Sequence, residues 1–171
     1  MRRLPLIFML LFATFMVARV TWCGDEGDED KEKLAAAVRG AKIPLQSGLE
    51  AASAAGKPIS AKFELEEGKL QLSVYVAKSG AFSEIVVDHQ TGKIAKKEPI
   101  AGGEDLEAAK AQDKAMAGAK AGLAAVVMKA LGANKGYLAV SVLPAVEAGH
   151  AVVKITLVKG ESWKELTERL D

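Results

Sequence analysis

Residues 61–76, AKFELEEGKLQLSVYV, alternate apolar and polar side chains on both sides of the dipeptide Glu67-Gly68. The apolar positions are Ala61, Phe63, Leu65, Leu70, Leu72, Val74 and Val76. A period of two predicts β-strands with one apolar face each, and a Glu-Gly dipeptide between them predicts a turn. The stretch therefore predicts an antiparallel hairpin whose apolar face must be covered by another element.

A helix is predicted directly before this hairpin. Leu45, Leu49 and Ala52 stand at positions i, i+4 and i+7, which places them on one face of a helix. Gly56 and Pro58 then end the helix.

A third strand is predicted after the hairpin, over residues 83–88, with Ile85 and Val87 on one side. Three consecutive strands form an antiparallel meander, and the preceding helix is the natural cover for its apolar face. The fold class expected from this region is α+β.

The same order of elements recurs later in the chain. Residues 40–42 read Gly-Ala-Lys, and residues 118–120 repeat them 78 positions later. Beyond the hairpin the offset becomes 81, which maps Gly68 onto Gly149. We attribute the difference to a longer hairpin loop in the second copy, over residues 144–149. The sequence thus predicts a duplicated helix-plus-meander protein, and leaves open whether the two meanders form one sheet.

The predicted repeats span residues 34–98 and 104–171. Residues 96–103 are rich in Pro and Gly and predict a connection, with the linker itself at residues 99–103. An Ala-rich helical segment follows over residues 104–132, and we expect a break between Gly118 and Gly122.

The second repeat is expected to differ at its end. Strands are predicted over residues 137–143 and 151–158. Ser162 and Glu165 then have the spacing of a capping box. We therefore expect a short C-terminal helix, with Trp163 and Leu166 packing inward.

Residues 1–23 have the layout of a secretory signal peptide. Two arginines precede an apolar run over residues 4–18, and the chain turns acidic after Cys23. The run is shorter than the roughly 20 apolar residues of a transmembrane helix, although a retained anchor is the alternative. Residues 24–33 are predicted to be flexible, because their acidic side chains repel one another. We expect an exported protein, periplasmic or extracellular.

Cys23 is the only cysteine, so the chain has no internal disulfide bond. Cleavage after Cys23 would leave 148 of the 171 residues, enough for one domain or two small ones. The alternative is a lipid on Cys23, which would anchor the protein to the membrane. Against it, Trp22 stands where the lipoprotein pattern has Gly, Ala or Ser.

Composition and motifs exclude several classes of function. Without the three arginines of the signal peptide, 20 basic residues remain against 22 acidic ones, a net charge of about −2. The chain has no basic stripe for a nucleic-acid partner. His89 and His150 match no metal-ligand spacing, and motifs for a nucleophile or a phosphate-binding loop are absent. We therefore expect no catalytic residue, no metal site and no cofactor.

The first predicted repeat resembles the PepSY domain family over residues 43–94. The most specific part of the match is the ending Asp88-His-Gln-Thr91-Gly92, followed by an apolar residue. Asp88 is expected to accept hydrogen bonds from the next amides in an Asx-type turn, and Gly92 to supply a positive φ. We interpret Asp88, Thr91 and Gly92 as a structural motif, which the second repeat lacks.

The resemblance implies a non-enzymatic module that binds or inhibits an exported protease or another envelope protein. Such inhibition would act in trans, since the chain contains no protease domain. Tyr75, on the polar face of its strand, is a candidate contact residue for a partner, and a cross-strand contact is the alternative. Two other functions stay open: a structural or lipid-anchored envelope protein, and a carrier of a small ligand.

Overall fold

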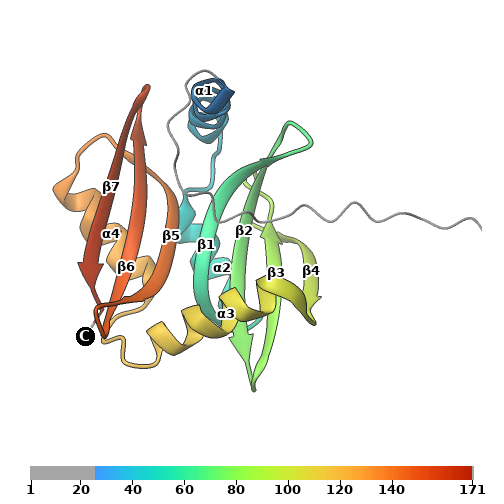
Figure 1. The fold of residues 1–171 in the computed structure, drawn as a ribbon. Helices are drawn as coiled ribbons and strands as arrows, with labels where there is room; N and C mark the ends of the chain where they lie inside the picture. The colour runs from blue at the N-terminus through green and yellow to red at the C-terminus, as the bar shows by residue number, and fades with distance from the viewer. Residues whose placement is uncertain (1–25, 171) are drawn as a thin grey trace, which may run out of the picture.

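The computed structural model describes residues 26–170, which form four helices and seven strands (Figure 1). The predicted signal peptide and Cys23 lie outside the described residues. In chain order the elements are α1 (Glu26–Arg39), α2 (Leu45–Ala52), β1 (Lys57–Glu66), β2 (Lys69–Lys78), β3 (Ala81–Val87), β4 (Ile94–Ile100), α3 (Gly103–Met116), α4 (Leu123–Ala133), β5 (Leu138–Glu147), β6 (His150–Lys159) and β7 (Ser162–Arg169). The predicted α+β class is confirmed.

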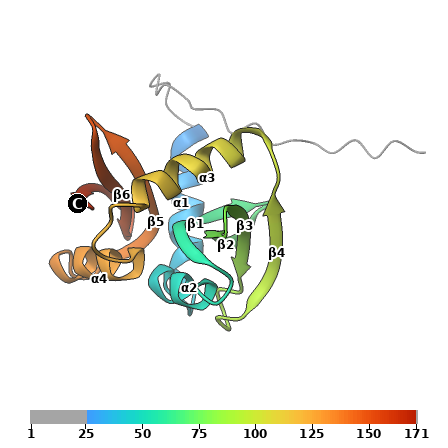
Figure 2. The ribbon, with the colours of Figure 1, turned by 90° about the horizontal axis from the view of Figure 1, so that it is seen from below.

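The strands form one antiparallel sheet in the order β4-β3-β2-β1-β5-β6-β7. The two predicted meanders therefore share a sheet, which the sequence pattern had left open. They join between β1 and β5, where Ala61 pairs with Val142 and Lys62 pairs with Ser141. Figure 2 shows α3 on one face of this sheet and α2 with α4 on the other.

The two meanders have the same register. Glu66 pairs with Lys69 at the first hairpin, and Glu147 pairs with His150 at the second, 81 positions later. The register irregularities, between residues 58 and 60 and between residues 139 and 141, also differ by 81. The third strands continue the relation, because β3 pairs with β2 as β7 pairs with β6.

The predicted longer hairpin loop over residues 144–149 is wrong. Strand β5 continues to Glu147, and both hairpins turn through two residues with positive φ, Glu67-Gly68 and Ala148-Gly149. The extra residues lie in the helices instead, since α2 has 8 residues and α4 has 11. Pro144 fits inside β5 although proline lacks a backbone donor.

The predicted C-terminal helix is also wrong, because residues 162–169 form strand β7. The chain turns sharply at Gly160, whose φ of 60° suits glycine, and then pairs with β6 from Ser162 to Arg169. This pairing provides backbone hydrogen bonds that a short helix would have to make alone. Trp163 and Leu166 do pack against the core, as expected, but from a strand.

The predicted linker at residues 99–103 begins inside a strand. Pro99 and Ile100 belong to β4, which pairs with β3 at the edge of the sheet. An edge strand tolerates proline because one side of its backbone has no strand partner. The predicted break between Gly118 and Gly122 is confirmed, since α3 ends at Met116 and α4 begins at Leu123.

The acidic segment predicted to be flexible is largely helical, because α1 begins at Glu26. Lys33 forms an ion pair with Glu29 one turn earlier, at 2.6 Å. Ala35 and Val38, further along the same helix, are buried in the core. Burial of this apolar face favours the helix over an extended chain.

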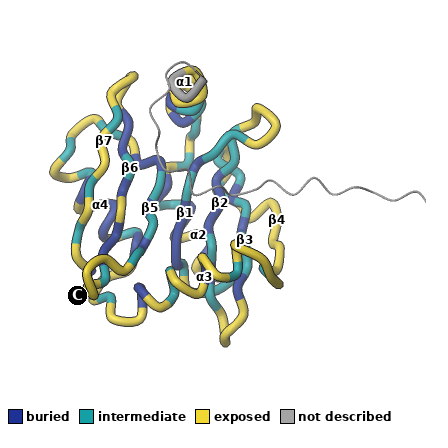
Figure 3. The backbone as a smooth tube through the Cα atoms, viewed as in Figure 1, coloured by how far each residue is buried: buried dark blue, intermediate teal, exposed yellow. Residues whose placement is uncertain are grey.

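The main core lies between the sheet and helices α2 and α4, with α1 at its rim, and its buried residues are dark blue in Figure 3. It includes Leu45 and Leu49 of α2, Val127 of α4, and Leu72 and Ile155 of the sheet. A smaller core lies on the opposite face, where Ile59, Phe82 and Ala109 meet under α3. Among residues 26–170, none of the helices is long and apolar enough to cross a membrane.

Candidate functional site

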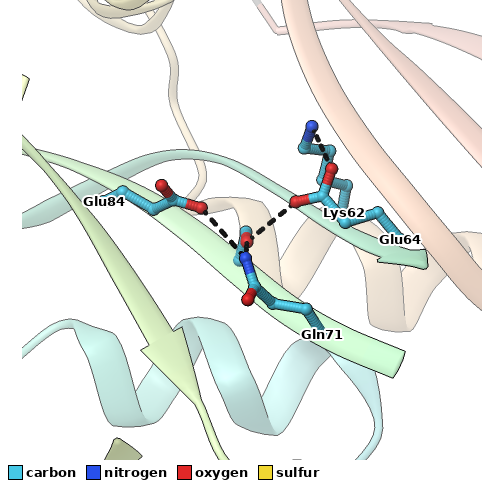
Figure 4. Close-up of polar contacts among 5 residues, drawn as sticks. Lys62, Glu64, Gln71 and Glu84 are labelled. Atoms are coloured by element: carbon cyan, nitrogen blue, oxygen red, sulfur yellow. Dashed lines mark hydrogen bonds and ion pairs between the residues drawn. The ribbon is translucent and has the colours of Figure 1, made fainter. Parts of the chain in front are cut away.

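The α3 face of the first meander holds a group of polar side chains, shown in part in Figure 4. We call it the polar cluster, and its members are Lys62 and Glu64 of β1, Gln71, Ser73 and Tyr75 of β2, and Glu84 of β3. These residues alternate along their strands with buried apolar residues of the main core. The strand pleat therefore places them together on the face that α3 partly covers.

Ser73 is the centre of the polar cluster. It is fully buried, and its Oγ donates a hydrogen bond to Glu64 Oε1 at 3.0 Å. The same Oγ accepts one from Gln71 Nε2 at 2.9 Å. Gln71 Nε2 also lies 3.5 Å from Glu84 Oε1, and Lys62 forms an ion pair with Glu64 (Figure 4). A hydroxyl so placed is satisfied as both donor and acceptor.

Burial and like charges shift two protonation equilibria here. Burial raises the pKa of Glu84, and the nearby carboxylate of Glu64 raises it further, while the positive charge of Lys62 opposes the shift. Burial also raises the pKa of Tyr75, helped by the carboxylates of Glu84 and Glu64. Tyr75 therefore keeps its hydroxyl proton. Lys62 Nζ lies 5.9 Å from the centroid of the Tyr75 ring.

Replacing Glu84 by glutamine is expected to raise the melting temperature at neutral pH. The folded pKa of Glu84 lies above the ordinary value of 4.5. Its contribution to stability is thus fully present below about pH 4.5, and is lost as the pH rises through the folded pKa. Glutamine removes the charge, so the gain in melting temperature over the unmodified protein should grow from pH 4 to pH 7. Thermal unfolding across this range measures it.

The exposed Glu161 provides the control for this change. Glu161→Gln removes the same charge from a turn and should shift the melting temperature far less. A Glu84→Gln variant that lost stability at pH 7 would contradict the argument, because it would show that the Glu84 carboxylate makes a net favourable contact.

A pocket of about 210 Å³ lies between the polar cluster and α3. Lys62 and Tyr75 line it from the sheet, and Asp105 and Gln112 line it from α3. Ser60, fully buried in the pocket wall, donates a hydrogen bond to Gln112 Oε1 at 2.7 Å. This bond fixes the middle of α3 over the sheet and leaves the pocket open beside it.

The second meander has no equivalent of the polar cluster. The positions 81 residues later than its six members are Leu143, Ala145, Val152, Lys154, Thr156 and Glu165. The buried serine at the centre is replaced by Lys154, which is exposed and pairs with Glu147 at 2.6 Å. The two meanders thus share a register but differ in the side chains that they present on this face of the sheet.

The turn predicted at Asp88 is present. Asp88 Oδ1 accepts hydrogen bonds from the amides of Gln90 at 2.8 Å and Thr91 at 3.1 Å. These two bonds are the main cause of the lowered pKa of Asp88. Gly92 has the expected positive φ, of 74°.

This turn also holds the start of α2. The carbonyl of His89 accepts hydrogen bonds from the amides of Lys42 and Ile43, each at 2.9 Å. Gln90 Nε2 donates to the carbonyl of Gly40 at 3.1 Å. Asp88, Thr91 and Gly92 therefore have the structural part expected of them. Asp88 and Gln71 of the polar cluster line one further pocket.

The two histidines lie in different parts of the fold. His89 lies in the Asp88 turn, and His150 begins β6, where its Nδ1 lies 2.8 Å from Arg169 Nη2. Within the described range no three His, Cys, Asp or Glu side chains are grouped as metal ligands. Cys23 lies outside that range.

Tyr75 differs from its prediction. It was expected on a solvent-exposed strand face, yet it is half-buried beneath α3, and Ser73 beside it is fully buried. Sequence reasoning missed Lys62, Glu64 and Glu84 as its neighbours. The signal was the run of polar and charged residues on one face of this meander. The second meander has apolar residues at three of the six corresponding positions, Leu143, Ala145 and Val152.

No family model, curated protein or solved structure matches this chain.

Proposed function

We propose that this chain is an exported, non-enzymatic binding module whose polar cluster and adjoining pocket contact another exported protein. The observation that supports it is the restriction of this half-buried polar surface to one of two meanders with the same register. A polar surface needed for the fold alone would be expected in both. The second meander then serves as scaffold.

The chemistry of the polar cluster suits a protein contact. Tyr75 offers a large rigid ring with a protonated hydroxyl, and aromatic residues are enriched at interfaces. Lys62 and Asp105 present opposite charges in the pocket lining, which favours one orientation of a partner. The pocket is open on one side and large enough for one side chain of a partner.

The proposed partner class is an exported protease, which the module would bind or inhibit in trans. Its support is the PepSY resemblance of residues 43–94, together with the Asx turn at Asp88 and the positive φ of Gly92. We also propose that the chain is a duplicated PepSY-like unit, on the ground that strand pairs in the two meanders differ by a constant 81 positions.

A protease-inhibition assay tests this function. The purified protein is titrated against the proteases secreted by its host, and cleavage of a fluorogenic peptide is followed. Saturable inhibition near stoichiometric amounts is expected. Tyr75→Phe combined with Lys62→Met should weaken it at least about tenfold, since a lost interfacial hydrogen bond and a lost charge each cost of order 1 kcal/mol.

The matched control is Thr156→Val, because Thr156 is the counterpart of Tyr75 in the second meander. It should inhibit as strongly as the unmodified protein. If both variants weakened inhibition equally, the contact with the protease would not lie at the polar cluster. Absence of inhibition, or digestion of the folded protein as a substrate, would count against the protease as partner, and crosslinking to exported proteins would then test binding itself.

A further inference from the structure

A second pocket, of about 280 Å³, opens on the face opposite the polar cluster. We call it the α2 pocket. It lies between the segment that leads into α2 and the start of β5, and its walls are mostly apolar. The apolar residues that line it include Ile43, Pro44, Phe63, Leu131 and Leu138. Phe63 is buried, whereas Leu138 is 37% exposed at the rim.

One polar atom in this pocket has no partner. Gln46 Oε1 is buried, and it accepts no hydrogen bond from any described residue. A buried acceptor without a donor costs about 1–3 kcal/mol. The wall of the α2 pocket therefore contains an unsatisfied acceptor, which a small rotation of the Gln46 side chain would present to an N–H or O–H group of a ligand.

The rim of the α2 pocket is positively charged. Arg39 and Lys42 line it. Arg39 uses Nη1 to donate to the carbonyl of Gly160 at 3.1 Å, which leaves its other N–H groups for further contacts. Helix α2 begins at the same place and has no acidic residue in its first turn, so the positive end of its dipole also favours an anion here.

Apolar walls, a free acceptor and a positive rim match one chemical group. The last residue of a peptide has an apolar side chain, a backbone N–H and a carboxylate within a few bonds of one another. We propose that the α2 pocket binds the carboxyl-terminal residue of a peptide, with its side chain near Phe63, its N–H on Gln46 Oε1 and its carboxylate on Lys42 and Arg39.

The proposed site belongs to the first half of the chain. Lys42 has a counterpart in Lys120, and Gln46 has one in Ala124, 78 positions later. The surface around Lys120 forms a different pocket, lined also by Lys129 and Glu168, which pair at 2.8 Å. Alanine at position 124 offers no side-chain acceptor. This proposal is independent of the protease contact, because the two sites lie on opposite faces of the sheet.

Isothermal titration with short peptides tests it. The probes are acetyl-Gly-Ala-Ala peptides that end in Leu, Phe, Val or Ile, each as the free acid and as the carboxamide. At least one free acid is expected to bind saturably in the micromolar to millimolar range. Its carboxamide should bind about tenfold more weakly, because it lacks the charge that Lys42 and Arg39 attract.

Three variants locate the site. Gln46→Leu removes the acceptor and should weaken binding about tenfold, without loss of thermal stability, since it also removes an unpaired buried atom. Lys42→Met should weaken binding similarly. Lys120→Met is the matched control and should bind as the unmodified protein does.

Several results would overturn the proposal. Equal binding of acid and carboxamide would exclude a carboxylate contact, and equal effects of Lys42→Met and Lys120→Met would move binding away from the α2 pocket. If no peptide bound saturably up to millimolar concentration, the α2 pocket would not be a peptide site and would hold only water. Sedimentation that shows self-association lost in Gln46→Leu would assign it to a second copy of the chain.

Discussion

Replacing Ile155 by alanine is expected to lower the free energy of unfolding by about 2–5 kcal/mol. Ile155 is fully buried in the middle of β6. It pairs with Val142 on β5 and with Leu166 on β7. Truncation would leave a cavity that the neighbouring strands, fixed by their own pairing, could fill only in part. Urea denaturation measures the change.

The neighbouring Thr156 supplies the control for Ile155. It lies on the opposite face of the same strand and is half-buried. Thr156→Ala should change the free energy of unfolding by within about 0.5 kcal/mol. If the two substitutions cost the same, β6 would not have the register described here, since a slip of one residue exchanges the two faces of a strand.

Replacing Gly56 by alanine is expected to destabilise the protein by about 1–3 kcal/mol. A Cβ at this position would stand 2.9 Å from the carbonyl oxygen of Ala77 and 3.2 Å from the side chain of Val76. The contact with Ala77 is with backbone in a paired strand, so β2 would have to shift. Thermal and urea unfolding both report the loss.

Gly118 is the control for this substitution, because a Cβ there meets nothing within 4 Å. Gly118→Ala should leave stability unchanged or slightly higher, since alanine reduces the freedom of the unfolded chain. A stable Gly56→Ala variant would mean that the segment between α2 and β1 can move away from β2.

The sequence predicted the parts of this fold that depend on local pattern. The alternation in residues 61–76 is clear because one face of the meander packs into the main core, while the other carries the polar cluster. The Asp88 turn was predicted because its hydrogen bonds close within four residues. Gly56 was predicted to end a helix, whereas α2 already ends at Ala52. The structure gives another reason for glycine at this position, its close approach to Ala77.

The parts that the sequence did not predict depend on distant partners. Ser162 and Glu165 have a helical capping pattern, but pairing with β6 places them in a strand. The polar cluster was missed because α3 covers it, through a bond between Ser60 and Gln112 that are 52 positions apart. Local spacing carries no information about such a contact.

The join between β1 and β5 has a consequence for assembly. Ala61 pairs with Val142, and these two residues are themselves 81 positions apart. A residue that pairs with its own counterpart marks the axis of a two-fold symmetric contact, the kind that closes a dimer of identical subunits. A single helix-and-meander unit that exposed β1 as an edge could therefore build the central six strands of this sheet, β3-β2-β1-β5-β6-β7, by association of two copies. In this chain α3 connects the two units covalently, so no association of separate copies is needed. The arrangement therefore does not depend on protein concentration.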